Sequence, residues 1–267
     1  MTDDQYRAVF RTSLFELAAA TAFLTRLPAA WMGVAADRRP DFTIAARAFP
    51  GVGLLVGLVG AIVLLLAHAL GMPLLASAAL SLAATIALTG ALHEDGLADT
   101  ADGFGGGTTA TRKLEIMRDS RIGTFGAVAL ILSLLLRTTL VANLLPYGAW
   151  PVATALIGAE IVSRAAIVQL WAALPPARFE GLASATGRPS RDTSLTAIGI
   201  AVVAALICGA IGTGILPVVV ALLVAGAATY AFQLLCALQI AGQTGDTLGA
   251  AQQVALVTYL MAIVAAT

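Results

Sequence analysis

Long apolar segments separated by short polar stretches make up most of the chain. Each segment is rich in Leu, Ala and Val and is close to the roughly 20 apolar residues that a helix needs to cross a bilayer. Because only helices and closed barrels satisfy their backbone hydrogen bonds within lipid, the pattern predicts helices. They are expected near residues 14–32, 49–70, 74–92, 124–145, 152–174, 194–213, 217–239 and 249–266.

The connections between these segments are of two kinds. Three are tight and uncharged, whereas four polar stretches hold most of the charged residues: 33–48, 93–123, 175–193 and 241–247. If the helices alternate in direction from residue 49, all four stretches lie on one side. The positive-inside rule makes that side the cytoplasmic face of a bacterial inner membrane. The first segment carries Glu16, Arg26 and Pro28, and an interfacial or re-entrant helix is expected there.

Composition supports a polytopic membrane protein. The chain is 59% hydrophobic and 11% charged, and its mean hydropathy is +0.92. We expect an all-α bundle in one transmembrane catalytic domain over residues 1–267, with about seven transmembrane helices plus the N-terminal helix. The formal net charge is zero, so a nucleic-acid partner is not expected. Cys208 and Cys236 lie within apolar segments and are expected to be buried thiols.

An acidic run is the first candidate for chemistry. Residues 94–103 hold four of the fifteen carboxylates. Written as a helix, Asp95, Asp99 and Asp102 are spaced i, i+4, i+7 and share one face. Their mutual repulsion calls for a cation, and carboxylate-bound Mg²⁺ typically binds a phosphate as well. The alternative is a solvated acidic helix cap.

A second group follows a glycine-rich turn at 103–107. Glu115 and Asp119 are one helical turn apart and are candidates for further metal ligands. Basic residues surround them and are candidates for binding phosphate: Arg112, Lys113, Arg118 and Arg121. The alternative is a surface helix in which these residues pair with one another.

Three further residues lie in the polar stretches. Thr244 and Asp246 are candidates for the phosphate or metal site, with a helix cap as the alternative. His93 directly precedes the acidic run. It is a candidate general base, although a lone histidine is more often structural.

Charges and glycines also occur inside the apolar segments. Glu160 and Arg164 are spaced i, i+4 and are expected to pair, with Arg164 kept as a candidate for substrate binding. Arg137 either extends to the membrane surface or faces the bundle interior. Gly53 and Gly57 have the small-xxx-small spacing of closely packed helices.

These motifs resemble one enzyme family. Residues 93–103 are similar to the H-x-D-G-L-A-D-x-x-D-G signature of cobalamin (5′-phosphate) synthase, also called adenosylcobinamide-GDP ribazoletransferase. Residues 114–124 and 242–250 continue the resemblance, which is collinear from about residue 15 to about residue 250.

The resemblance implies that α-ribazole or its 5′-phosphate attacks adenosylcobinamide-GDP and releases GMP. It implies Mg²⁺ held by Asp95, Asp99 and Asp102, with Arg118 and Arg121 stabilising the departing GMP. The corrinoid would contact residues 33–48 and 175–193. A homo-oligomer, or a complex with other enzymes of cobalamin assembly, stays open.

The chain departs from the family pattern at four positions, one of which is Ala183, where Gly is frequent. Glu94 replaces a residue that is commonly neutral and is therefore a further candidate metal ligand. Gln252 and Gln253 stand where a Glu is frequent. Two other Asp-rich membrane transferases, a CDP-alcohol phosphotransferase and an aromatic prenyltransferase, are alternatives. A transporter is a further alternative, but it would place its polar residues at mid-membrane.

Overall fold

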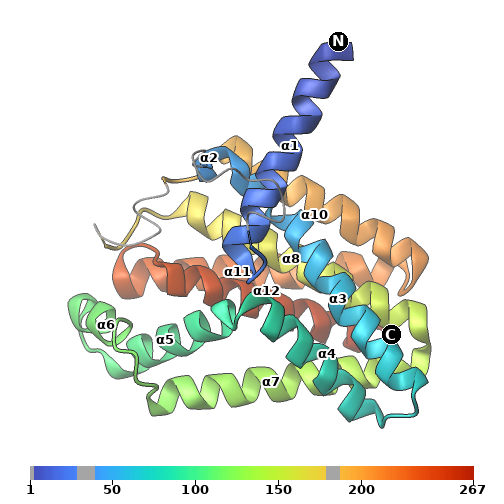
Figure 1. Ribbon diagram of the computed structural model, residues 1–267. Helices are drawn as coiled ribbons and strands as arrows, with labels where there is room; N and C mark the ends of the chain where they lie inside the picture. The colour runs from blue at the N-terminus through green and yellow to red at the C-terminus, as the bar shows by residue number, and fades with distance from the viewer. Residues whose placement is uncertain (1–2, 29–39, 179–186) are drawn as a thin grey trace.

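The structure, a computed structural model, describes residues 3–28, 40–178 and 187–267 (Figure 1). Residues 33–39 and 179–186 of the polar stretches lie outside the described residues. The described chain is helical, and its β-structure is limited to one isolated bridge between Pro176 and Gln243. The elements are α1 (Asp3–Leu24), α2 (Phe42–Ala45), η2 (Ala46–Ala48), α3 (Phe49–Ala69), α4 (Leu74–Thr89), α5 (Leu92–Gly106), α6 (Ala110–Ile116), α7 (Thr124–Leu144), η3 (Leu145–Tyr147), α8 (Ala149–Ala173), α10 (Arg191–Ile211), α11 (Ile215–Ile240) and α12 (Gly245–Ala266).

Six helical segments of the described chain are long and apolar enough to cross a membrane. A seventh crossing results if α4 and α5, which meet at an angle of 89°, form one broken span. The predicted helical membrane bundle is therefore confirmed. The first apolar segment falls partly in α1, which is not among these six segments.

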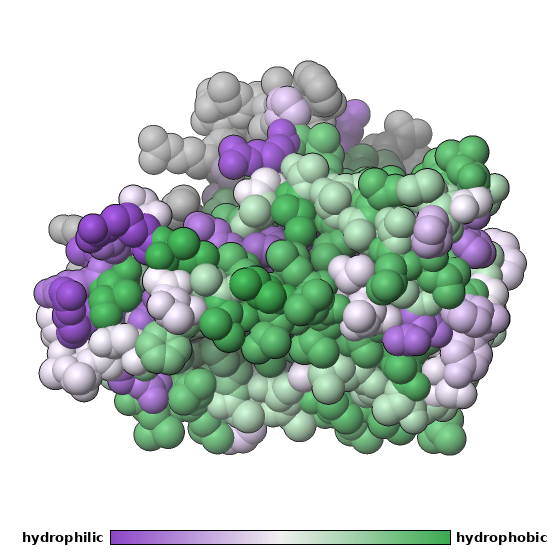
Figure 2. All heavy atoms as spheres, turned by 90° about the horizontal axis from the view of Figure 1, so that it is seen from below, coloured by the Kyte–Doolittle hydropathy of each residue, from purple (hydrophilic) through white to green (hydrophobic). Residues whose placement is uncertain are grey.

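The bundle is organised around α8 and α12. Within their most apolar windows, 83% of α8 and 67% of α12 are buried, against 22–28% for α7, α10 and α11. The outer helices turn apolar side chains outward, and Figure 2 shows a broad hydrophobic face with hydrophilic residues gathered at its left end. This distribution fits a bundle that is surrounded by lipid.

Glycines allow α3 to approach α8 closely. A Cβ atom at Gly57 would lie 2.7 Å from the Cα of Ile157, and one at Gly53 would meet the backbone of Glu160. The close packing predicted from the spacing of Gly53 and Gly57 is confirmed.

The four polar stretches meet on one side of the bundle, as the alternation of helices predicts. Hydrogen bonds link described residues of all four. The contacts run from Thr193 to the Thr43 carbonyl, from Arg178 to the Leu114 carbonyl and from the Ala177 amide to the Gln243 carbonyl, each 2.8 Å long. Most of the acidic and basic candidate residues are thereby gathered at one end, with Glu94 and Arg164 as exceptions inside the bundle.

Candidate functional site

A sharp bend places the acidic run at this polar end. Helix α4 ends at Gly90, with φ of 66°, and Ala91 follows with φ of 58°. Both residues are in the left-handed region, which turns the chain by 89° into α5. The acidic run is helical, as predicted, and its helix leaves the bend toward the polar stretches (Figure 1).

Helix α5 packs directly on the first turn of α12. A Cβ atom at Gly96 would lie 2.6 Å from the carbonyl oxygen of Asp246 and 3.2 Å from the Cα of Gly249. Only a glycine permits this approach, which brings the acidic face of α5 beside Asp246. The sequence-based assignment of Asp246 to the same site as the α5 aspartates gains direct support.

Acidic groups from two helices meet at this crossing. The half-buried Asp99 carboxylate lies within electrostatic range of three other carboxylates and one guanidinium. These groups are Asp95, Asp246, Asp102 and Arg178. The local excess of negative charge favours a bound cation.

Arg178 is the basic member of this site, and sequence reasoning missed its role. Its Nη2 donates to the Leu114 carbonyl at 2.8 Å, and its Nη1 lies 3.7 Å from Oδ2 of Asp246. Partial burial lowers the pKa of Arg178, while Asp246 raises it. The sequence signal that could have indicated this role is the Pro175-Pro176 pair, because proline rings restrict the backbone just before Arg178.

Asp102 has a different environment from Asp95 and Asp99. Its Oδ2 accepts from the Gly123 amide at 2.7 Å and its Oδ1 from the Gly126 amide at 2.8 Å. Both amides belong to the start of α7, so Asp102 caps that helix. Both carboxylate oxygens of Asp102 therefore already accept hydrogen bonds from α7, and its role as a metal ligand stays a prediction.

The predicted metal ligands Glu115 and Asp119 pair with arginines instead. Glu115 Oε2 lies 3.0 Å from Arg112 Nη1, and Asp119 Oδ2 lies 2.6 Å from Arg121 Nη2. Arg121 holds the pKa of Asp119 down to about 2. These four residues thus form the paired, exposed surface of the alternative in this structure, and their predicted roles in the site stay predictions.

The same four residues line a polar cleft of about 340 Å³ next to Asp102. The other two basic candidates, Lys113 and Arg118, have neighbours outside this cleft. Lys113 Nζ donates to Gln239, and Arg118 lies within electrostatic range of Arg178. Arg118 is therefore a predicted phosphate-binding residue whose charge acts on Arg178 of the site.

Thr244 begins α12 with a capping box. Its side chain accepts from the Thr247 amide at 3.3 Å, and its backbone amide donates to the Thr247 hydroxyl at 2.8 Å. The Thr244 hydroxyl also donates to Asp246 at 3.2 Å. A cap was expected here with Asp246 as the capping residue, whereas the structure places Thr244 at the N-cap, where its hydroxyl also orients Asp246.

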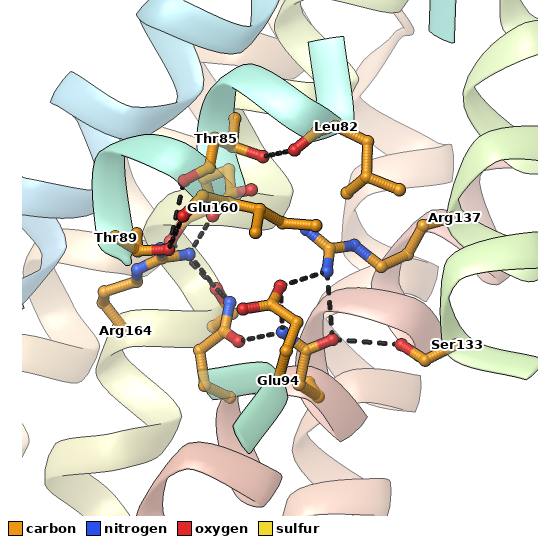
Figure 3. Close-up of polar contacts among 12 residues, drawn as sticks. Leu82, Thr85, Thr89, Glu94, Ser133, Arg137, Glu160 and Arg164 are labelled. Atoms are coloured by element: carbon orange, nitrogen blue, oxygen red, sulfur yellow. Dashed lines mark hydrogen bonds and ion pairs between the residues drawn. The ribbon is translucent and has the colours of Figure 1, made fainter. Parts of the chain in front are cut away.

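Three predicted site residues lie inside the bundle instead, and Figure 3 shows two of them, Glu94 and Arg164. His93 is 2% exposed, Glu94 is 7% exposed and Arg164 is 2% exposed. Glu94 pairs with Arg137 of α7, and Arg164 pairs with Glu160 of α8. All three are therefore shielded from a ligand at the polar end in this structure, and their predicted roles in the site stay predictions.

The remaining residues fit Mg²⁺ with phosphate as its main partner. Within the described chain, no group of three or more His, Cys, Asp and Glu side chains forms a ready-made metal cage. Mg²⁺ typically binds one or two carboxylates plus phosphates and keeps several waters, so a cage is not required. Asp95, Asp99 and Asp246 supply oxygen ligands of the preferred type.

Comparison with known proteins identifies close relatives. The Cobalamin-5-phosphate synthase family matches residues 16–264. An adenosylcobinamide-GDP ribazoletransferase of Azorhizobium caulinodans is 44% identical over 252 residues, which cover 94% of this chain and 95% of the relative. Proteins with the same name from Brucella ovis and Brucella anthropi are each 42% identical over 247 residues, covering 91% of this chain and 94% of each relative. No solved structure matches the chain.

Proposed function

Because the chain belongs to the Cobalamin-5-phosphate synthase family, we propose that it carries out the transfer for which its relatives are named. It joins the adenosylcobinamide phosphate moiety of adenosylcobinamide-GDP to α-ribazole or α-ribazole 5′-phosphate. GMP is the second product. One observation carries the proposal: the α5 aspartates meet Asp246 and Arg178 where the polar stretches converge.

The reaction is a displacement at phosphorus. A hydroxyl oxygen of the ribazole forms a bond to the phosphorus that bears cobinamide. The bond from that phosphorus to the bridging oxygen of GMP breaks, and the hydroxyl proton leaves. Such transfers depend mainly on positioning and on stabilising charge on the phosphate oxygens.

Acidic and basic residues of the site have separate tasks. Asp95, Asp99 and Asp246 would hold Mg²⁺, which supplies positive charge to the diphosphate when it is bound. Arg178 and Arg118 attract the phosphate oxygens of the departing GMP. Arg178 lies within electrostatic range of Asp246, Arg118 and Asp99, which fits these roles.

A carboxylate of the site takes the hydroxyl proton. His93 is enclosed by the bundle, so a carboxylate of the site is a better candidate for the general base than His93. Asp99 is the candidate base because it is half-buried and lies within electrostatic range of both Asp95 and Asp246. Proton transfer requires direct contact or a single intervening water.

We also propose that the polar end faces the cytoplasm across a bacterial inner membrane. The four polar stretches hold most of the chain's arginines, and the helix connections at the other end are uncharged. Association with a second copy or with other enzymes of cobalamin assembly stays a prediction.

Release of GMP from adenosylcobinamide-GDP tests the function. The purified protein in lipid nanodiscs is supplied with α-ribazole or its 5′-phosphate, with Mg²⁺ or with EDTA. We expect GMP and a corrinoid product in equal amounts, only when both substrates and Mg²⁺ are present. Flux of a labelled cation through proteoliposomes without GMP release would support a transporter and overturn the proposal.

A further inference from the structure

Three side chains from three helices form a closed triangle inside the bundle (Figure 3). Glu94 comes from α5, Arg137 from α7 and Gln253 from α12. Arg137 Nη1 donates to Glu94 Oε1 at 2.6 Å and to Gln253 Oε1 at 3.1 Å. Gln253 Nε2 closes the triangle by donating to Glu94 Oε1 at 3.0 Å.

The triangle is shielded from solvent. Glu94 is 7% exposed, Arg137 is 4% exposed and Gln253 is 2% exposed. Removing one partner of a buried charge pair leaves the other charge buried without a counter-charge, which strongly destabilises the folded protein. The three helices are therefore held at one relative position. The buried Arg164–Glu160 pair differs because both of its members belong to α8.

Helix α5 is fastened to α7 at both ends. Glu94 binds Arg137 near the start of α5, and Asp102 binds the first amides of α7 near its end. Asp95 and Asp99 lie between these two attachments, and both are within electrostatic range of Asp246 in the first turn of α12. A shift of α5 would move both carboxylates relative to Asp246.

We propose that the Glu94–Arg137–Gln253 triangle positions the transfer site by fixing α5 against α7 and α12. Arg137 and Gln253 are positioning residues, because they act through the placement of Asp95, Asp99 and Asp246. This inference rests on the proposed function.

The geometry also allows the carboxylate at position 94 and the amide at position 253 to be exchanged. Arg137 Nη1 already reaches the side-chain oxygens of residues 94 and 253. In a Glu94→Gln/Gln253→Glu double variant, the carboxylate lies on α12 and the amide on α5. All three sides of the triangle then have a donor and an acceptor, and the total charge is unchanged. The exchange removes the hydrogen bond from Gln253 to Gln252.

The experiment compares both single variants with the double variant in nanodiscs. Glu94→Gln leaves Arg137 without a carboxylate, and Gln253→Glu adds an uncompensated one. We expect kcat for GMP release to fall on the order of 10²-fold in each single variant, because small displacements at a reacting centre are that costly. Mn²⁺ affinity, measured by electron paramagnetic resonance without substrates, should fall in parallel. The double variant should recover both to within about tenfold of wild type, since coupled sites are non-additive.

Two further variants keep the test decisive. Arg137→Lys keeps the charge but replaces the planar guanidinium with a compact ammonium on a shorter side chain, so it should fold and lower kcat by about tenfold. Thr229→Val is the matched control, because this buried hydroxyl donates only to the Ala225 carbonyl of its own helix. It should leave kcat and Mn²⁺ affinity unchanged.

Several results would overturn the inference. Folded single variants, or a folded Arg137→Lys variant, with wild-type kcat and Mn²⁺ affinity would show that the triangle does not position the site. A folded double variant as impaired as the single variants would show the same. Absence of GMP release by the wild-type protein would refute the proposed function instead, and the Mn²⁺ measurements would still test the triangle.

Discussion

The four carboxylates of α5 occupy different environments although they are close in sequence. Glu94 is paired inside the bundle, and Asp102 caps α7. Asp95 and Asp99 lie beside Asp246 at the polar end. The role of each residue follows from its partners, so substitutions at these positions should have different effects.

Asp95 and Asp99 should be needed for turnover but not for folding. We expect Asp95→Ala and Asp99→Ala each to lower kcat by at least ~10²-fold, because each removes charge stabilisation at the phosphate. GMP release and thermal unfolding of the purified variants measure the two effects. Asp119→Asn is the control, since this exposed carboxylate pairs with Arg121 outside the cluster. Near-wild-type kcat in Asp95→Ala or Asp99→Ala would remove that residue from the site.

Asp102→Ala should act mainly on stability. It removes two hydrogen bonds to a carboxylate, each worth roughly 1.5–3 kcal/mol. We expect a lower unfolding temperature with Mn²⁺ affinity close to wild type. Asp99→Ala should show the opposite combination. A loss of Mn²⁺ affinity in Asp102→Ala as large as in Asp99→Ala would restore Asp102 to the metal ligands.

At the scale of elements, the crossing of α5 and α12 depends on Gly96. A methyl group there would meet the Asp246 carbonyl at 2.6 Å, and overpacking typically costs about 1–3 kcal/mol. We expect Gly96→Ala to lower both the unfolding temperature and kcat. Gly226→Ala on α11 is the matched control, because a Cβ atom there has no neighbour within 4 Å. Equal effects of the two substitutions would contradict the crossing.

The sequence predicts the helices better than it predicts their contacts. Apolar length and the i, i+4, i+7 spacing were sufficient for the spans and for α5. The bend at Gly90 and Ala91 was not predicted, because Ala91 carries no signal for the left-handed conformation it adopts.

The sequence also could not predict which side chains pair when they are far apart along the chain. Glu94 and Arg137 are separated by 43 positions, and Arg178 and Leu114 by 64. Because Glu94 and Asp95 are adjacent in sequence, both were assigned to the same site, although the fold gives their side chains different partners. Spacing did predict the Arg164–Glu160 pair, since both residues lie on one helix.

The whole molecule has two chemically different ends. Hydrogen bonds join the four polar stretches at one end. The short connections at the other end carry no charge. A soluble nucleotide substrate must reach the polar end, so the orientation of the bundle decides which compartment supplies it.

Helix α7 offers a direct test of orientation because its 21 residues span about 30 Å. Ser120 precedes it at the polar end, and the 57% exposed Tyr147 follows it at the other end. In a Cys208→Ala/Cys236→Ala background, single cysteines at these positions are treated with a membrane-impermeant maleimide. The positive-inside rule predicts that Tyr147→Cys is labelled in intact spheroplasts and that Ser120→Cys is labelled only after permeabilisation. The reverse pattern, in variants that still release GMP, would place the transfer site on the opposite face and require its nucleotide substrate outside the cytoplasm.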